Sequence, residues 1–355
     1  MEKKPKTKFA SRSMETPTHW EDLARKYGPV MYLELGEVPT VIISSPSTSK
    51  QVLKTHDLAF ASRPQFTSTD IVMYNNKDIA FAEYGDYWKQ MRKICIMELP
   101  SAKMNRATGI KGNGAYGGED LVDVFLRIKE NDQLQFPITN DHIKAVILDM
   151  FTAGTETSST TIIWALSELM KHPNVMAKAQ SEVRQAFKEK IDFDEEDLDN
   201  LPYLKLVIKE TLRLHAPSIV HRECREETII DGSTIPAKAT VLVNTWAIGR
   251  DPEVWDDPES FIPERFENST IDYLGNNYEY LPFGAGKRIC PGMQFGLANV
   301  KQPLARLLYH FDWGLPCGTS TPKDLDMREK SGLSAAKEKD LYLIAKTNQS
   351  LDVML

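Results

Sequence analysis

One ten-residue loop constrains this chain more than any other feature of its sequence. Residues 283–292 read FGAGKRICPG, so three glycines surround one cysteine, and a helical pattern follows directly. A glycine-rich loop can press its backbone against a flat cofactor. Cys290 precedes a helix start and has Lys287 and Arg288 close in sequence, which favours the thiolate form that a soft metal ligand requires. We therefore predict that Cys290 binds a metal.

The other cysteines and the overall charge exclude several classes of protein. Cys95, Cys224 and Cys317 lie far apart and form no CxxC pair, so they indicate neither a disulfide framework nor a structural zinc site. We expect them to be small buried hydrophobes in a reducing compartment. A net charge of -7 argues against a nucleic-acid binder, which usually carries a basic stripe.

Patterning predicts one mainly α-helical fold with a small β component. Alternating residues at 30–44 indicate a hairpin, and residues 228–244 indicate strands around an Asp-Gly turn. Helical patterns occupy residues 46–56, 83–99, most of 119–190, 202–215 and 293–309. The long segment 142–172 contains three acidic residues, so we expect a buried helix and no transmembrane segment. Residues 102–118 are rich in Gly and Asn and lack periodicity, which predicts a loop.

Two short motifs lie on the predicted helices. Residues 153–158 read AGTETS, and a glycine followed by hydroxyl residues can loosen a helix locally and create room for oxygen. Read alone, such a segment is more often a packing feature. Glu210 and Arg213 in KETLR are three residues apart and can form an ion pair, although most such pairs lie on the surface and contribute little stability.

Taken together, these motifs resemble the cytochromes P450. The positions that match the haem-binding signature of that family are Phe283, Gly286, Arg288, Cys290 and Gly292. The resemblance implies the cytochrome P450 fold and haem b (iron protoporphyrin IX) as cofactor. It makes Cys290 the iron ligand, whose electron donation favours O–O cleavage, and it pairs Arg288 with a haem propionate.

The same resemblance implies roles for the other motifs. Glu156 and Thr157 are the acid and the alcohol that deliver protons during oxygen activation. Trp88 and Arg92, spaced WxxxR, and Arg222 in HREC contact the haem propionates. An ordinary amphipathic helix and a solvated arginine are the alternatives for these three residues.

A further set of residues is expected to be structural. The resemblance joins Glu210 and Arg213 to Arg265, from the segment PERF, as a lock without a catalytic role.

The resemblance covers residues 16–104 and about 118–327, so we expect an internally truncated cytochrome P450. Residues 1–15 are a basic polar leader in place of the family's membrane anchor, and the irregular junction at 105–117 stands where the helices that roof the substrate pocket would be. The rest of the domain occupies residues 118–355. An unroofed pocket admits water and leaves apolar patches exposed. Ala216, where the family tends to have proline, and a divergent tail after Arg328 are minor departures.

Phrases such as WALSELMKHP and LLYHFDW are similar to plant microsomal members that oxidise terpenoids. This implies a haem-thiolate mono-oxygenase that hydroxylates small hydrophobic plant metabolites with dioxygen. The resemblance also implies that the electrons come from a separate protein, NADPH–cytochrome P450 reductase. Lys89, Lys93 and Lys287 are expected to form its docking face, although surface lysines more often serve solubility alone. The family lies on the cytosolic face of the endoplasmic reticulum membrane, and without an anchor this chain is expected to be cytosolic or peripheral.

Two other functions compete with this one. A catalytically silent, truncated P450 would bind haem weakly or not at all. A haem sensor or carrier would use the same cysteine loop, but it would not need the Glu156 and Thr157 pair.

Overall fold

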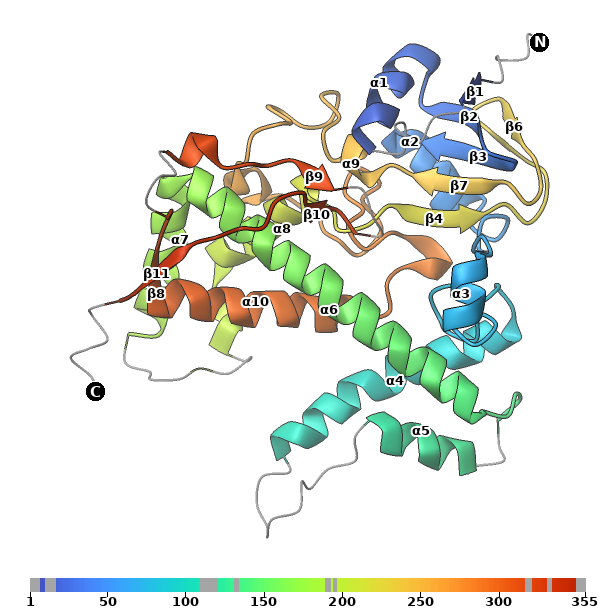
Figure 1. Ribbon diagram of the computed structural model, residues 1–355, viewed down its shortest axis with the longest axis horizontal. Coiled ribbons are helices and arrows are strands. Elements are labelled where there is room, and N and C mark those ends of the chain that lie inside the picture. The colour runs from blue at the N-terminus through green and yellow to red at the C-terminus, as the bar shows by residue number, and fades with distance from the viewer. Residues whose placement is uncertain are drawn as a thin grey trace.

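The fold is described from a computed structural model, in which the helices surround one long central helix and a small sheet lies at one end (Figure 1). The structure describes residues 7–9, 17–108, 121–130, 134–188, 193, 197–316, 321–330 and 334–348. This mainly α-helical architecture with a small β component is the predicted one. Within the described ranges, no helix combines the length and the apolar character that crossing a bilayer requires.

The long helix α6 passes through the centre of the molecule. The α-helices are α1 (Pro17–Tyr27), α2 (Pro46–Lys50), α3 (Thr67–Val72), α4 (Asp86–Thr108), α5 (Leu121–Glu130), α6 (Asn140–Lys171), α7 (Pro173–Ala186), α8 (Pro202–Leu214), α9 (Thr245–Ile248) and α10 (Met293–His310). Shorter helical turns are η2 (Gln51–Thr55), η3 (Asp197–Asn200), η4 (Pro263–Phe266), η5 (Gly286–Arg288) and η6 (Pro322–Asp324). The helix α6 begins where the Thr139 side chain accepts a hydrogen bond from the His142 amide, and it then runs diagonally through the molecule (Figure 1).

The main sheet joins strands that are far apart in the sequence. Its order is β1 (Thr7–Phe9), β2 (Val30–Leu35), β3 (Val38–Ile43), β7 (Thr240–Val243) and β4 (Val220–Glu223). Among the described residues, three antiparallel pairs accompany this sheet: β5 (Thr228–Ile230) with β6 (Ser233–Ile235), β8 (Phe311–Gly314) with β11 (Ile344–Thr347), and β9 (Glu329–Lys330) with β10 (Ala336–Lys337). The predicted hairpin at 30–44 is confirmed. So are the strands at 228–244, whose turn residues Asp231 and Gly232 both have positive φ.

The hydrophobic core has two main helical parts. The larger part lies between α6, α7, α8 and α10, where Leu169, Leu204 and Leu304 are fully buried. A smaller part joins α4, α5 and α6 through Met91 and Phe125. Since burying a leucine side chain contributes about 1.5–3 kcal/mol, these contacts fix the helices that surround the cysteine loop.

The structure differs from the sequence-based prediction at two segments. The helix α4 continues to Thr108, so the first four residues of the expected junction at 105–117 are helical, and residues 109–117 lie outside the described part. Good helix formers such as Ala102, Lys103 and Met104 explain the longer helix. Within the expected leader 1–15, residues 7–9 form β1 because the edge of β2 offers free backbone partners. The division of the chain into its parts otherwise stays a prediction.

Candidate functional site

The cysteine loop is folded tightly around its glycines. Gly286 has a φ of +69°, and a Cβ at this position would lie 2.3 Å from the carbonyl oxygen of Leu53, so only glycine fits. The Cys290 amide donates to the Phe283 carbonyl at 3.0 Å and closes the loop. The Phe283 ring packs against the larger core. A Cβ on Gly292 would meet no atom within 4 Å, so packing does not explain a glycine there.

The environment of Cys290 differs from the one that the sequence predicted. Burial raises the pKa of the Cys290 thiol above its usual value, and this effect exceeds the opposing effects of the Gly292 amide and of Arg92 and Arg63. Asp149 raises the pKa further. The helix start and Lys287 and Arg288 therefore do not by themselves make this cysteine a thiolate. A bound metal displaces the proton of a coordinating thiol, so the donor still suits a soft metal ion.

Arg288 and Trp88 meet in the interior, above the loop. Arg288 is buried and donates to the carbonyl oxygens of Ala61 and Ala82 at 2.6 Å each. Its guanidinium lies 4.1 Å from the Trp88 ring centroid. The Trp88 indole donates to the Ile79 carbonyl at 2.9 Å, which fixes the ring beneath the guanidinium.

Arg222 and Arg92 lie beside them. Arg222 is buried and donates to the carbonyl oxygens of His221 at 2.9 Å and Ala285 at 3.1 Å. Arg92 donates to the Ile289 carbonyl at 2.6 Å, next to Cys290. The structure thus brings together the four side chains that the sequence predicted to contact the haem propionates: Trp88, Arg92, Arg222 and Arg288.

Sequence reasoning missed a fourth arginine. Arg63 donates to the same His221 carbonyl as Arg222, and burial lowers its pKa to about 10 although Asp149 and Asp78 act in the opposite direction. Arg63 precedes a proline in a segment without a recognised motif, so the sequence offered no signal for it. Only the tertiary contact with His221 reveals it.

These four guanidiniums form an anion site, which we call the arginine cluster: Arg63, Arg92, Arg222 and Arg288. Burial is the largest effect that lowers the pKa of Arg288, to about 9, and repulsion from Arg63 and Arg92 lowers it further. Among the described residues, the buried Nε atoms of Arg63 and Arg222 have no hydrogen-bond partner. Buried guanidinium donors without a partner are costly, so the cluster fits a ligand with two carboxylates, such as the propionates of haem.

The predicted oxygen-activating pair lies on the central helix. The Thr157 hydroxyl donates to the Ala153 carbonyl at 2.6 Å, and the exposed Glu156 carboxylate accepts from the Ser334 hydroxyl at 2.5 Å. The predicted local opening is wrong for this structure, because α6 is α-helical at every residue. A threonine hydroxyl can bond the carbonyl four residues back without interrupting the helix.

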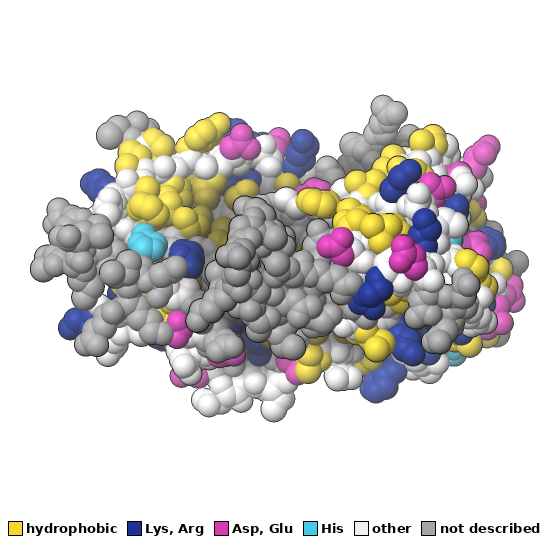
Figure 2. Space-filling view, turned by 90° about the horizontal axis from the view of Figure 1, so that it is seen from below, with side chains coloured by type: hydrophobic (Ala, Val, Ile, Leu, Met, Phe, Trp, Pro, Cys, Tyr) yellow, Lys and Arg dark blue, Asp and Glu magenta, His cyan; other side chains and the backbone are white. Residues whose placement is uncertain are grey.

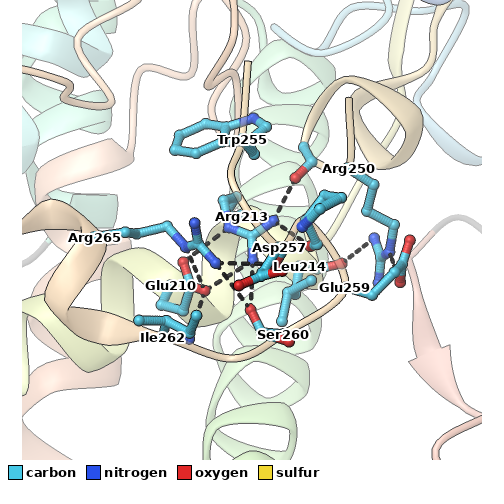
Figure 3. Close-up of polar contacts among 12 residues, drawn as sticks. Glu210, Arg213, Leu214, Arg250, Trp255, Asp257, Glu259, Ser260, Ile262 and Arg265 are labelled. Atoms are coloured by element: carbon cyan, nitrogen blue, oxygen red, sulfur yellow. Dashed lines mark hydrogen bonds and ion pairs between the residues drawn. The ribbon is translucent and has the colours of Figure 1, made fainter. Parts of the chain in front are cut away.

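The predicted structural lock is present as a buried network (Figure 3). Arg213 binds both carboxylate oxygens of Glu210 at 2.8 Å, and Arg265 binds one of them at 2.9 Å. The Ile262 amide donates to Glu210 at 2.8 Å, and the Trp255 ring lies 5.3 Å from the Arg213 guanidinium. The network ties α8 to residues 249–265.

The three lysines expected at the docking face share one groove. It has a volume of about 350 Å³ and is lined by Tyr84, Trp88, Lys89, Arg92, Lys93, Ile96, Met97 and Lys287. The groove therefore lies directly against the arginine cluster, since Arg92 belongs to both and Trp88 of the groove lies 4.1 Å from the Arg288 guanidinium.

Comparison with known proteins agrees with this site. The family model described as Cytochrome P450 matches residues 8–113 and 111–343. Relatives include premnaspirodiene oxygenase of Hyoscyamus muticus, 47% identical over 437 residues that cover 91% of this chain and 87% of that protein. A second is 5-epiaristolochene 1,3-dihydroxylase of Nicotiana tabacum, 47% identical over 440 residues with the same coverage.

The solved structures agree on the fold. A zebrafish cytochrome P450 determined with abiraterone has a TM-score of 0.79 at 24% identity, and the match covers 94% of this chain and 99% of that one. With its cysteine loop, its arginine cluster and relatives of this similarity, the chain belongs to the cytochrome P450 family of haem mono-oxygenases.

Proposed function

We propose that this chain binds haem b and oxygenates a small apolar terpenoid with dioxygen, using electrons that NADPH–cytochrome P450 reductase supplies. The observation that carries the proposal is the arginine cluster beside the Cys290 loop. Buried guanidiniums with free donors, adjacent to a cysteine, are a combination that a haem with its two propionates satisfies.

Different residues of the chain bind different parts of the haem. Cys290 is the iron ligand, and Gly286 and Gly292 let the loop backbone approach the ring. The arginine cluster and Trp88 hold the propionates. When bound, the haem would supply the chemistry that activates dioxygen, one atom of which would enter the substrate while the other leaves as water.

Glu156 and Thr157 serve the proton supply. Glu156 lies on an exposed part of α6, and the Thr157 hydroxyl is the adjacent donor on this helix. Glu210, Arg213 and Arg265 act through the fold alone, because their network is buried and its partners are one another and backbone groups.

The groove with Lys89, Lys93 and Lys287 supports the reductase as partner. An acidic face of a flavoprotein complements these cations, and Arg92 at the groove wall donates to the backbone next to Cys290. Electrons therefore need to travel only a short way through the protein. We place the protein on the cytosolic face of the endoplasmic reticulum membrane, where such reductases act.

The names of the relatives support the substrate class. Premnaspirodiene oxygenase and 5-epiaristolochene 1,3-dihydroxylase both carry terpene hydrocarbons in their names. Such substrates offer no charged group, so apolar side chains would have to recognise them.

A second candidate function is a haem-poor, catalytically impaired chain. The alignments extend over 437 and 440 residues, more than the 355 of this chain, so part of each relative has no counterpart here. We infer that the missing part lies near residues 105–117. Large apolar side chains are exposed, with 70% of Phe151 and 60% of Met97 accessible, and hydrophobic patches are visible in Figure 2. A pocket that admits water wastes electrons on side reactions.

The test is the carbon monoxide difference spectrum of the reduced protein, expressed with a haem precursor and compared with Cys290→Ser. A thiolate-type Soret band that the variant loses, followed by terpene oxidation with reductase, supports the mono-oxygenase. Haem uptake without turnover selects the impaired chain. Turnover coupling that Thr157→Ala leaves unchanged would instead favour a haem sensor or carrier.

A further inference from the structure

The pair of strands β9 and β10 is joined to the central helix at a defined place, and we call this pair the C-terminal hairpin. The Trp164 indole of α6 donates to the Ala335 carbonyl at 2.6 Å, and the Lys337 ammonium lies 4.7 Å from the Trp164 ring centroid. The Ala335 amide donates to the Pro217 carbonyl at 3.0 Å. These contacts hold the residues around β10 against both α6 and the segment that follows α8.

A buried histidine adds a second fastening. His215 stacks flat on Trp164, with ring centroids 3.9 Å apart and an interplanar angle of 1°. One ring nitrogen lies 2.8 Å from Glu168 of α6, and the other lies 3.1 Å from Glu329 of β9. Both strands are therefore connected to α6. The strand β9 is connected through Glu329 and His215, and β10 through the preceding residue Ala335.

The result of this fastening is the position of Ser334. Its side chain is buried, with 5% of the residue exposed, and its hydroxyl donates to the Glu156 carboxylate. A glutamate on an exposed helix face otherwise samples several rotamers. The Ser334 hydroxyl, held in place by the anchored hairpin, selects one rotamer of Glu156. Glu156 lies two helical turns before Trp164 on α6.

We propose that Ser334 is a positioning residue that holds the Glu156 carboxyl for proton delivery. This inference rests on the proposed role of Glu156. The Ser334 hydroxyl donates its hydrogen to the carboxylate and fixes its direction, while Glu156 itself lies on an exposed part of α6, within reach of water.

Turnover coupling tests this role in the haem-loaded chain with reductase. Ser334→Ala is expected to lower product formed per NADPH about fivefold, the factor that one hydrogen bond contributes, with an unchanged carbon monoxide spectrum. Ser334→Thr keeps the hydroxyl and is expected to restore coupling. With Glu156→Gln already present, Ser334→Ala should add no further loss. An equal loss in both backgrounds, or none in either, would overturn the proposal.

A second measurement needs neither haem nor turnover. In Ser334→Cys, the neighbouring carboxylate disfavours the thiolate, so adding Glu156→Gln is expected to speed alkylation of the introduced thiol about threefold or more. Peptide mass spectrometry separates this thiol from the other cysteines. Equal alkylation rates would refute the Ser334 contact itself, whereas failure of the unaltered chain to bind haem or form product would refute the proposed function.

Discussion

Replacing Glu210 by glutamine is expected to destabilise the protein severely without touching the haem site. The Glu210 carboxylate is fully buried and accepts four hydrogen bonds of 2.8 to 2.9 Å, from Arg213, Arg265 and the Ile262 amide. A glutamine side chain has one acceptor oxygen and one NH₂ group. The NH₂ group would therefore face a donor, and two guanidiniums would lose their counter-charge.

The magnitude follows from the burial of this network. Removing one partner of a buried ion pair costs about 3–5 kcal/mol, because a charge is left in the interior without compensation. Arg213 has no exposed side-chain surface and Arg265 has 9%, so little water can replace Glu210. The folded-to-unfolded ratio should fall by roughly 10²- to 10³-fold or more.

Urea unfolding followed by circular dichroism measures this loss. Asp199→Asn is the matched control, since Asp199 pairs with Lys301 at the same 2.8 Å but is 74% exposed. An exposed pair of this kind contributes about 0–1 kcal/mol. If both variants lost the same free energy of unfolding, the distance between the charged atoms and not their burial would determine how much each ion pair contributes. That result would refute the reasoning.

Three further predictions concern the site itself. Gly286→Ala should lower the free energy of unfolding by about 1–3 kcal/mol, because of the positive φ at this position and the clash with the Leu53 carbonyl. Gly292→Ala, measured in the same thermal unfolding assay, should cost less than about 1 kcal/mol. Similar costs for the two variants would contradict the packing argument. Burial, and then repulsion from Asp78, raises the pKa of Asp149 from 3.8 to about 7, so the folded state binds more protons than the unfolded state between these values. The free energy of unfolding should therefore fall as pH rises from about 4 to 7, and Asp149→Asn should flatten the dependence of the urea midpoint on pH. An unchanged dependence would show that other groups cause it. Lys93→Glu should raise the reductase concentration needed for half-maximal turnover about three- to tenfold at low salt, an effect that should shrink as salt is added.

The pocket roof that we infer to be missing bears on the choice between the two candidate functions. The helices α4, α5 and α6 still form a core of their own around Met91 and Phe125, so this end of the molecule has its own packing. Phe151, in the middle of α6, is nevertheless mostly exposed. Haem retention therefore depends on the cysteine loop and the arginine cluster, whereas efficient turnover depends on what covers this face of α6.

Much of this protein can be predicted from the sequence because several of its motifs are local. The turns of the loop around Cys290 and the three-residue spacing of Glu210 and Arg213 act within one loop or one helix, where sequence spacing sets geometry. The hairpin at 30–44 and the central helix follow from hydrophobic periodicity for the same reason. The family resemblance rests on these segments, and the comparisons confirm it.

Tertiary structure decided what depends on distant segments and on burial. Arg63 joins the arginine cluster and Ser334 reaches Glu156 only because the fold brings segments together across more than 150 residues. The pKa of Cys290 is raised, against the expectation from its helix start, because desolvation is set by the packing of the whole domain. Sequence spacing thus determines which groups are available, and packing determines how they are charged and which partners they meet.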